Sequence, residues 1–108
     1  MKDKIKKLIE LCDYYRLDLQ IRYYGDRQVC FSGISENDDE IFMVSIWYLN
    51  NERRFYIQLN SQLEQYKNNG SFSKEEILLL LSLDDLTDDE LGIKPQGVEG
   101  KWKEWAII

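Results

Sequence analysis

Histidine is absent from this sequence of 108 residues, and its absence excludes several classes of catalytic site. Serine and cysteine nucleophiles activated by histidine, HExxH zinc sites and histidine general bases all require that side chain. Phosphate-binding loops are also missing, because the six glycines are scattered and neither GxGxxG nor GxxxxGK(S/T) occurs. An enzyme would have to use carboxylates, tyrosines or a cysteine in an arrangement that no sequence motif indicates. We therefore expect no catalytic activity and no cofactor.

Long hydrophobic runs are missing as well. The longest wholly apolar run, Ile77 to Leu81, is far too short to span a bilayer. The first fifteen residues carry charges at helical intervals and do not resemble a signal peptide. The two cysteines, Cys12 and Cys30, form no CxxC pair. We expect a cytoplasmic protein with reduced thiols and no membrane contact.

The composition is that of one acidic domain covering residues 1–108. Hydrophobic residues make up 44% of the chain, which is enough for a core without disulfides or metals. The formal net charge of −6 disfavours direct binding to nucleic acid or to anionic membranes. Residues 36–108 carry seven basic and fifteen acidic side chains, whereas residues 1–35 carry seven and five. An electrostatic partner is therefore expected to be a basic protein that contacts the later part of the chain.

The first half predicts a helix followed by four strands. Asp3 is a suitable helix N-cap, and Cys12 is expected to be a buried, unreactive thiol on the apolar stripe. That stripe comprises Ile5, Leu8, Ile9, Cys12 and Tyr15. From Leu17 to Tyr24 the apolar residues alternate with polar ones, which indicates a half-buried strand.

Short polar segments separate the next strands. Gly25-Asp26 predicts a two-residue hairpin loop into a strand in which Val29 and Phe31 share a face. After the polar turn at residues 35–40, the run from Ile41 to Leu49 is apolar on both faces and predicts a central strand covered on each side. A turn at residues 50–52 then leads into a strand at residues 53–59. These strands predict an antiparallel meander.

Basic and aromatic residues are interleaved at the first hairpin, in the run Arg22 to Arg27. Such interleaving is used to bind single-stranded nucleic acid. In an acidic chain it is more typical of the solvated side of a hairpin, and we interpret both arginines in that way.

The second half is predicted to be helical. Capping boxes occur at Ser61–Glu64, Ser73–Glu76 and Thr87–Glu90. The second box is expected to open a helix that ends at Leu81 or Leu83, and Gly92 is expected to stop the last one. The chain ends with residues 101–108, whose alternation predicts a final strand of the sheet, although Trp102 and Trp105 could also share a helical face. The expected fold is α+β, with a sheet of four to five strands, an N-terminal helix and short C-terminal helices.

The densest acidic stretch is SLDDLTDDELG, Ser82–Gly92, with five acids and no basic residue. Its capping box explains most of these acids, because negative charge is favourable in the first turn of a helix. A calcium loop beginning at Asp85 fits less well. Its sixth position is glutamate where glycine is needed, and its twelfth is Gln96 instead of glutamate. We expect no dedicated metal site.

The function expected from this pattern is non-catalytic binding to a basic protein. Carboxylates form charge-assisted hydrogen bonds with Arg and Lys similar to those of phosphates. An acidic surface can therefore occupy the nucleic-acid-binding groove of another protein and inhibit that protein. This requires that the fold bring the two acidic segments side by side. The predicted contact residues are Asp38, Asp39, Glu40, Asp84, Asp85, Asp88, Asp89 and Glu90.

The order of N-terminal helix, antiparallel sheet and later acidic helices resembles that of small acidic bacteriophage inhibitors of host defence, the anti-CRISPR and anti-restriction proteins. The resemblance covers the pattern of the whole chain and implies inhibition of a host-defence nuclease. It assigns no individual residue. The alternative is a toxin-neutralising immunity protein or a comparable accessory module, with Trp102, Trp105, Tyr23 and Tyr24 as contact residues. A structural virion or scaffold component also remains open.

Overall fold

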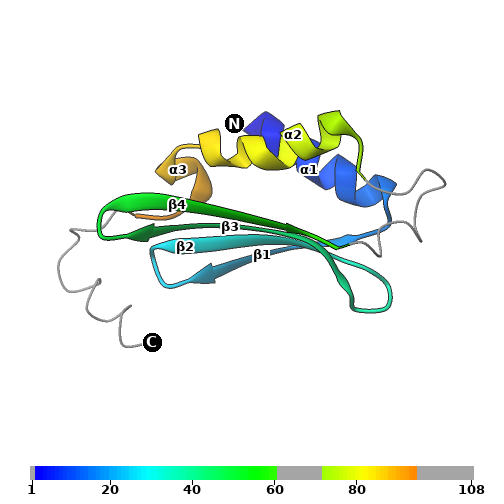
Figure 1. The fold of residues 1–108 in the computed structure, drawn as a ribbon, viewed down its shortest axis with the longest axis horizontal. Helices are drawn as coiled ribbons and strands as arrows, with labels where there is room; N and C mark the ends of the chain where they lie inside the picture. The colour runs from blue at the N-terminus through cyan, green and yellow to red at the C-terminus, as the bar shows by residue number, and fades with distance from the viewer. Residues whose placement is uncertain (1, 61–71, 95–108) are drawn as a thin grey trace.

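The computed structural model describes residues 2–60 and 72–94, which form an antiparallel sheet with helices on one face (Figure 1). The predicted α+β class is confirmed, with four strands in the described residues. The predicted helix beginning at Ser61 and the predicted strand at residues 101–108 lie outside the described residues. In chain order the elements are α1 (Lys2–Tyr14), β1 (Asp18–Tyr24), β2 (Gln28–Ile34), β3 (Glu40–Leu49), β4 (Glu52–Leu59), α2 (Lys74–Leu81), the 3-10 helix η2 (Ser82–Asp85) and α3 (Asp88–Leu91).

Helix α1 differs from its prediction at the N-terminus and on one side. It begins at Lys2, so Asp3 lies in the first turn and is not the N-cap. Its negative charge there interacts favourably with the helix dipole. The prediction that Ile9 is buried was wrong, since 46% of that residue is exposed. Leu11 takes its place because the buried stripe at Leu8, Leu11, Cys12 and Tyr15 follows i, i+3, i+4, i+7 spacing.

The β1–β2 hairpin has a loop of three residues, Gly25, Asp26 and Arg27, and not the predicted two. Gly25 adopts a φ of +68°, which glycine tolerates without strain. The prediction that both flanking arginines are solvated holds for Arg22 but was wrong for Arg27, which is only 1% exposed. Backbone hydrogen bonds hold the loop against its neighbours: the carbonyl of Arg27 accepts from Tyr48 N (3.1 Å) and that of Asp26 accepts from Lys94 N (2.6 Å).

Strand β3 is the interior strand with the most buried residues, and it pairs with β2 and β4. Phe42, Val44 and Ile46 face the helices and are fully buried. The predicted cover on both faces was wrong for the part of the chain that the structure describes, because α1, α2 and α3 all lie on the same face (Figure 1). The register shifts where β2 ends, and the resulting bulge allows the successive residues Ile41 and Phe42 both to be buried.

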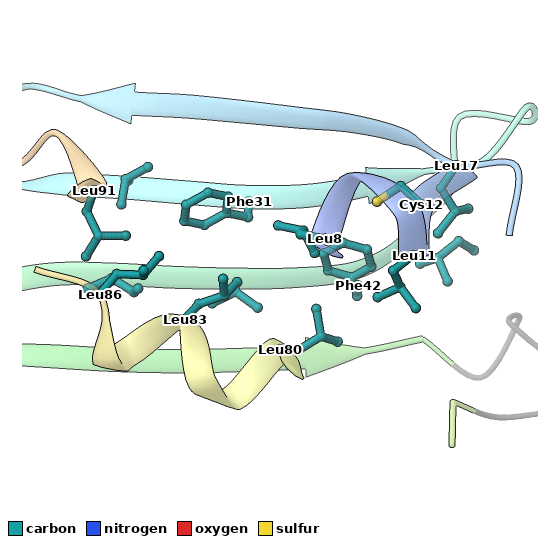
Figure 2. Close-up of a cluster of buried hydrophobic side chains, with 14 of the residues drawn as sticks. Leu8, Leu11, Cys12, Leu17, Phe31, Phe42, Leu80, Leu83, Leu86 and Leu91 are labelled. Atoms are coloured by element: carbon teal, nitrogen blue, oxygen red, sulfur yellow. The ribbon is translucent and has the colours of Figure 1, made fainter. Parts of the chain in front are cut away.

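The hydrophobic core fills the space between the sheet and the helices. Figure 2 shows leucines of the segment that runs from α2 to α3 placed in succession along the sheet, opposite Phe31 and Phe42. These leucines are Leu80, Leu83, Leu86 and Leu91, and all are buried. Of the apolar run Ile77–Leu81, Leu80 is fully buried, whereas Leu78 and Leu81 are 55% and 41% exposed. No helix among residues 2–60 and 72–94 combines the length and apolar character needed to cross a membrane.

Candidate interaction surfaces

The acidic stretch at η2 and α3 follows α2, and capping boxes open both α2 and α3. The predicted capping boxes are confirmed at Ser73–Glu76 and Thr87–Glu90, where each N-cap hydroxyl accepts from the N3 amide and each N3 glutamate accepts from the N-cap amide. α3 ends at Gly92, whose φ is +77°. The 3-10 turn between the helices places Asp84 and Asp85 outward while Leu83 points into the core. These elements form a surface that we call the α3 acidic end, comprising Asp84, Asp85, Asp88, Asp89 and Glu90.

Two of these five acids, Asp84 and Asp88, contact side chains of the sheet. The Tyr48 hydroxyl donates to the Asp88 carboxylate, with 3.0 Å to each oxygen. The guanidinium nitrogens of Arg53, in β4, lie 3.7 Å from an Asp84 carboxylate oxygen and 3.8 Å from an Asp88 carboxylate oxygen. These distances are those of ion pairs and are too long for hydrogen bonds. Burial raises the pKa of Tyr48, and its hydrogen bond to Asp88 acts in the same direction. Asp88 therefore connects α3 to the sheet.

Glu90 is held locally, within the capping box that opens α3. The backbone amide of Thr87 donates to its carboxylate (2.8 Å), and this bond lowers the pKa of Glu90, whereas burial acts in the opposite direction. Asp84, Asp85 and Asp89 are exposed. Lys4 approaches Asp85 at 3.7 Å, an exposed pair that adds little to stability. The α3 acidic end thus presents Asp84, Asp85 and Asp89 to solvent, while Arg53 links Asp84 and Asp88 to the sheet and the capping box holds Glu90.

The second predicted acidic group is on the β2–β3 loop. Ser35 Oγ accepts from the amides of Asn37 (3.2 Å) and Asp39 (3.1 Å), and this bonding shapes the loop. Asp38 is exposed with a φ of +65°, a conformation that aspartate tolerates better than most residues. Glu40 opens β3 and accepts a hydrogen bond from Ser32 Oγ (3.0 Å).

The fold does not bring the two acidic groups together. Glu40 is the first residue of β3, whereas Tyr48, which binds Asp88, lies next to its last residue. Eight strand residues span about 26 Å at roughly 3.3 Å per residue. The β2–β3 loop and α3 lie at opposite ends of the sheet in Figure 1. The expectation of a single surface built from both segments is therefore not met.

The sheet face opposite the helices is a third surface, which the sequence analysis did not identify as a site. Cross-strand pairing places Tyr24, Gln28, Trp47 and Arg54 in one row. The next row contains Arg22, Cys30, Ser45 and Tyr56. Tyr24 and Tyr56 are 47% and 50% exposed. We call these two rows the open sheet face. The signal for it was the alternation in β1 and β4, which assigned Arg22, Tyr24, Arg54 and Tyr56 to the polar sides of those strands.

The alternative set of aromatic contact residues is also divided by the fold. Tyr23 lies on the helix-facing side of β1, and its hydroxyl donates to the carbonyl of Leu91 (2.8 Å). Tyr24 lies on the open sheet face. Trp102 and Trp105 lie outside the described residues. Of these four residues, Tyr24 is the described one that projects onto an uncovered surface.

Neither cysteine lies in a reactive arrangement with other ligands. Cys12 is buried as predicted, and burial raises the pKa of its thiol to about 12, with Asp13 and Asp18 contributing in the same direction. Within the described ranges, no group of three or more Cys, Asp or Glu side chains is arranged to hold a metal ion. The polar and aromatic groups on the three surfaces are carboxylates, arginines, tyrosines and a tryptophan.

Comparisons of the chain with protein-family models, with curated proteins and with solved structures return no match. The function is therefore inferred from the geometry of the three surfaces. Two of them are acidic and lie at opposite ends of the sheet, and the third combines tyrosine, tryptophan and arginine.

Proposed function

We propose that this protein is a non-catalytic binding module that presents its α3 acidic end to a basic surface of a partner protein. A nucleic-acid-binding groove, such as that of a host-defence nuclease, is the kind of surface that such an acidic end would occupy and block. The observation that carries the proposal is the exposure of Asp84, Asp85 and Asp89 on a base that Arg53 and Tyr48 tie to the sheet.

Preorganisation is what distinguishes this surface from a merely soluble acidic face. Holding carboxylates in place before binding lowers the entropy lost on association. Charged groups of this kind also raise the association rate with a partner of opposite sign. The acids of the β2–β3 loop lie too far away to act in the same small contact, and in this proposal they are not required.

The test is capture from a bacterial lysate by the immobilised protein, with elution at increasing salt and identification by mass spectrometry. We expect a nucleic-acid-binding enzyme that elutes as salt rises and that competing DNA displaces, since both effects follow from charge-assisted contacts. The captured enzyme is then purified and its DNA cleavage measured with and without the protein. Inhibition of cleavage supports the proposal, and unaltered cleavage contradicts the inhibitory role.

A matched pair of variants tests the surface itself. The triple variant Asp84→Asn, Asp85→Asn, Asp89→Asn is expected to weaken capture by about tenfold or more, equivalent to about 1.4 kcal/mol. The control, Asp3→Asn, Glu10→Gln, Asp13→Asn, removes three exposed acids from α1 and the same net charge. Equal losses in both variants would show that only net charge matters and would contradict the proposed surface.

A second candidate is an accessory or immunity-like module that binds through the open sheet face. Tyrosine, tryptophan and arginine are enriched at the centres of protein interfaces, and Tyr24, Trp47 and Arg54 lie in one row of that face. A partner held through high salt, lost in Tyr56→Ala and retained in the acid triple variant, would favour this candidate over the acidic one.

A further inference from the structure

Strand β1 is an edge of the described sheet, and its side chains are exposed on both faces. It is the first strand in the order β1-β2-β3-β4, so the described strands pair only one of its two edges. On its helix-facing side Ile21 and Tyr23 are 42% and 53% exposed, although their cross-strand partners Phe31 and Val29 are buried. An exposed edge strand with apolar side chains is a template for pairing with a further strand.

The other edge strand of the described sheet, β4, is covered better at its centre. Its helix-facing residues Phe55 and Ile57 are half-buried and pack against the core. Strand β1 is therefore the edge at which apolar side chains in the middle of the strand remain exposed.

The polar face of β1 carries one charge of each sign. Asp18 and Arg22 lie four residues apart in the strand, so both project onto the side of the sheet opposite the helices, and both are exposed. Gln20 lies between them, where it donates to Asp18 (3.3 Å) and accepts a hydrogen bond from Arg22. A strand with a negative charge at its start and a positive charge near its end is complementary to an antiparallel copy of itself.

An alignment centred on Gln20 satisfies both the charges and the apolar residues. It sets Asp18 of one copy opposite Arg22 of the other, and the twofold axis repeats this pair. On the other face the same alignment sets Leu19 opposite Ile21, again twice. A centre at Ile21 would lose both charge pairs. Opposite charges and apolar side chains that face each other across strands stabilise pairing, whereas like charges oppose it.

We propose that two copies of this chain bind to each other through the free edge of β1, as an antiparallel strand pair centred on Gln20. Each residue keeps its own face in this pairing, so the two sheets join into one and both helix layers lie on the same side. The dimer carries two α3 acidic ends. The inference is independent of the proposed function, because the acids of η2 and α3 take no part in the contact.

The size of the contact sets its expected strength. A single strand edge buries less than the roughly 800 Å² per partner of a standard protein interface, so the dimer is expected to be weak and reversible.

Sedimentation equilibrium of the full chain, at concentrations from about 10 μM to about 1 mM, covers the range in which a weak dimer dissociates. The average mass is expected to rise from that of one chain toward that of two. The β1 amides that point away from β2 should become protected from hydrogen exchange over the same range. A mass that is constant with concentration overturns the proposal, and so does protection that is equal at all concentrations.

Two charge reversals test the alignment. Asp18→Arg places arginines opposite each other at both charge pairs, and Arg22→Asp places aspartates there. Each variant alone is expected to associate about tenfold or more weakly than the wild type. An equimolar mixture of the two restores opposite charges at both pairs and should recover association as a heterodimer. Both positions are exposed, so neither change is expected to disturb the fold.

Asp13→Arg and Lys6→Asp are the matched controls, because they make the same changes in net charge at exposed positions of α1. Each is expected to dimerise within about threefold of the wild type, since screening weakens the effect of distant surface charges. Unchanged dimerisation in both β1 variants would place the contact elsewhere and overturn the proposal. Equal losses in the controls would overturn it as well, because only net charge would then matter.

Discussion

Gly33 is a residue whose importance comes from its direct cross-strand partner, Phe42. A Cβ added to it would overlap the Phe42 ring, at 2.7 Å from Cδ2, and would lie 3.0 Å from the Leu17 side chain. All three residues belong to the packed region under α1. The absence of a side chain at this position is what allows Phe42 to lie across β2.

Substitution Gly33→Ala is therefore expected to lower the free energy of unfolding by about 1–3 kcal/mol, through overpacking of the core. Urea denaturation followed by tryptophan fluorescence measures the change. Phe42→Leu alone and the double variant complete a cycle in which the two losses should not add, because the smaller side chain leaves room for the new methyl group. Strict additivity would contradict the proposed contact.

Cys12 gives a prediction that depends on pH. Because burial raises its pKa to about 12, about one thiol in ten thousand is ionised at pH 8 in the folded protein. Alkylation by iodoacetamide at pH 8, read by mass spectrometry, should therefore modify Cys12 slowly in the folded protein and rapidly in urea. Equal rates in the two conditions would contradict the buried site.

The raised pKa of Cys12 also makes the free energy of unfolding depend on pH. Between pH 9 and 12 the unfolded chain releases the Cys12 proton while the folded chain retains it, so the contribution of this group is intact below pH 9 and declines as the pH rises. Cys12→Ala should consequently reduce the loss of stability over that range. The raised pKa of Tyr48 acts in the same direction, so some alkaline sensitivity should remain.

At the scale of elements, the attachment of α3 to the sheet depends on polar side chains as well as on buried leucines. Arg53 and Tyr48 come from β4 and β3, and both contact acids of the η2–α3 segment. Arg53 is mostly buried, so its loss would leave Asp88 without its cation in a partly desolvated position. The next residue, Arg54, lies on the opposite face and forms an exposed pair with Glu52 (2.9 Å).

Two adjacent arginines thus provide a matched test. Arg53→Ala is expected to cost about 1–2 kcal/mol of unfolding free energy, whereas Arg54→Ala should cost less than about 0.5 kcal/mol. Thermal unfolding of both variants at low and high salt measures the difference. Similar losses for the two substitutions would show that Arg53 does not connect α3 to the sheet.

At the scale of the whole molecule, the separation of the two acidic groups decides how they act. Their separation of about 26 Å is roughly three Debye lengths at physiological salt. Asp38→Asn combined with Glu40→Gln should therefore leave capture by the α3 acidic end nearly unchanged at that salt. Adding these two changes to the triple variant should give the sum of the separate effects, measured by the same capture experiment. A large loss from the loop variant alone would indicate a partner that spans both ends.

Several features followed from local sequence, because they depend on residues near one another in the chain. The capping boxes at Ser73 and Thr87, the stop at Gly92 and the shared buried face of Val29 and Phe31 are examples, and the structure confirms each of them. Local hydrogen bonds and backbone preferences suffice to specify such features. The order of helix, meander and short helices could be predicted for the same reason.

Features that depend on distant residues could not be predicted in this way. Arg27 is buried in a loop whose backbone bonds to Tyr48 and Lys94, both distant in the sequence, and Ile9 is exposed because of how α1 is rotated over the sheet. The alternation in β1 and β4 predicted two faces but not that helices would cover only one of them in the described chain.

The sequence alone determined the acidic character of this protein, its α+β class and the local helix ends, since composition and short-range hydrogen bonding depend on no distant contact. The tertiary structure alone decided which acids share a surface. It joined Asp84 and Asp88 through Arg53 and left Asp38 and Glu40 at the far end of β3, because the positions of residues separated along the chain are set by the pairing and packing of whole strands.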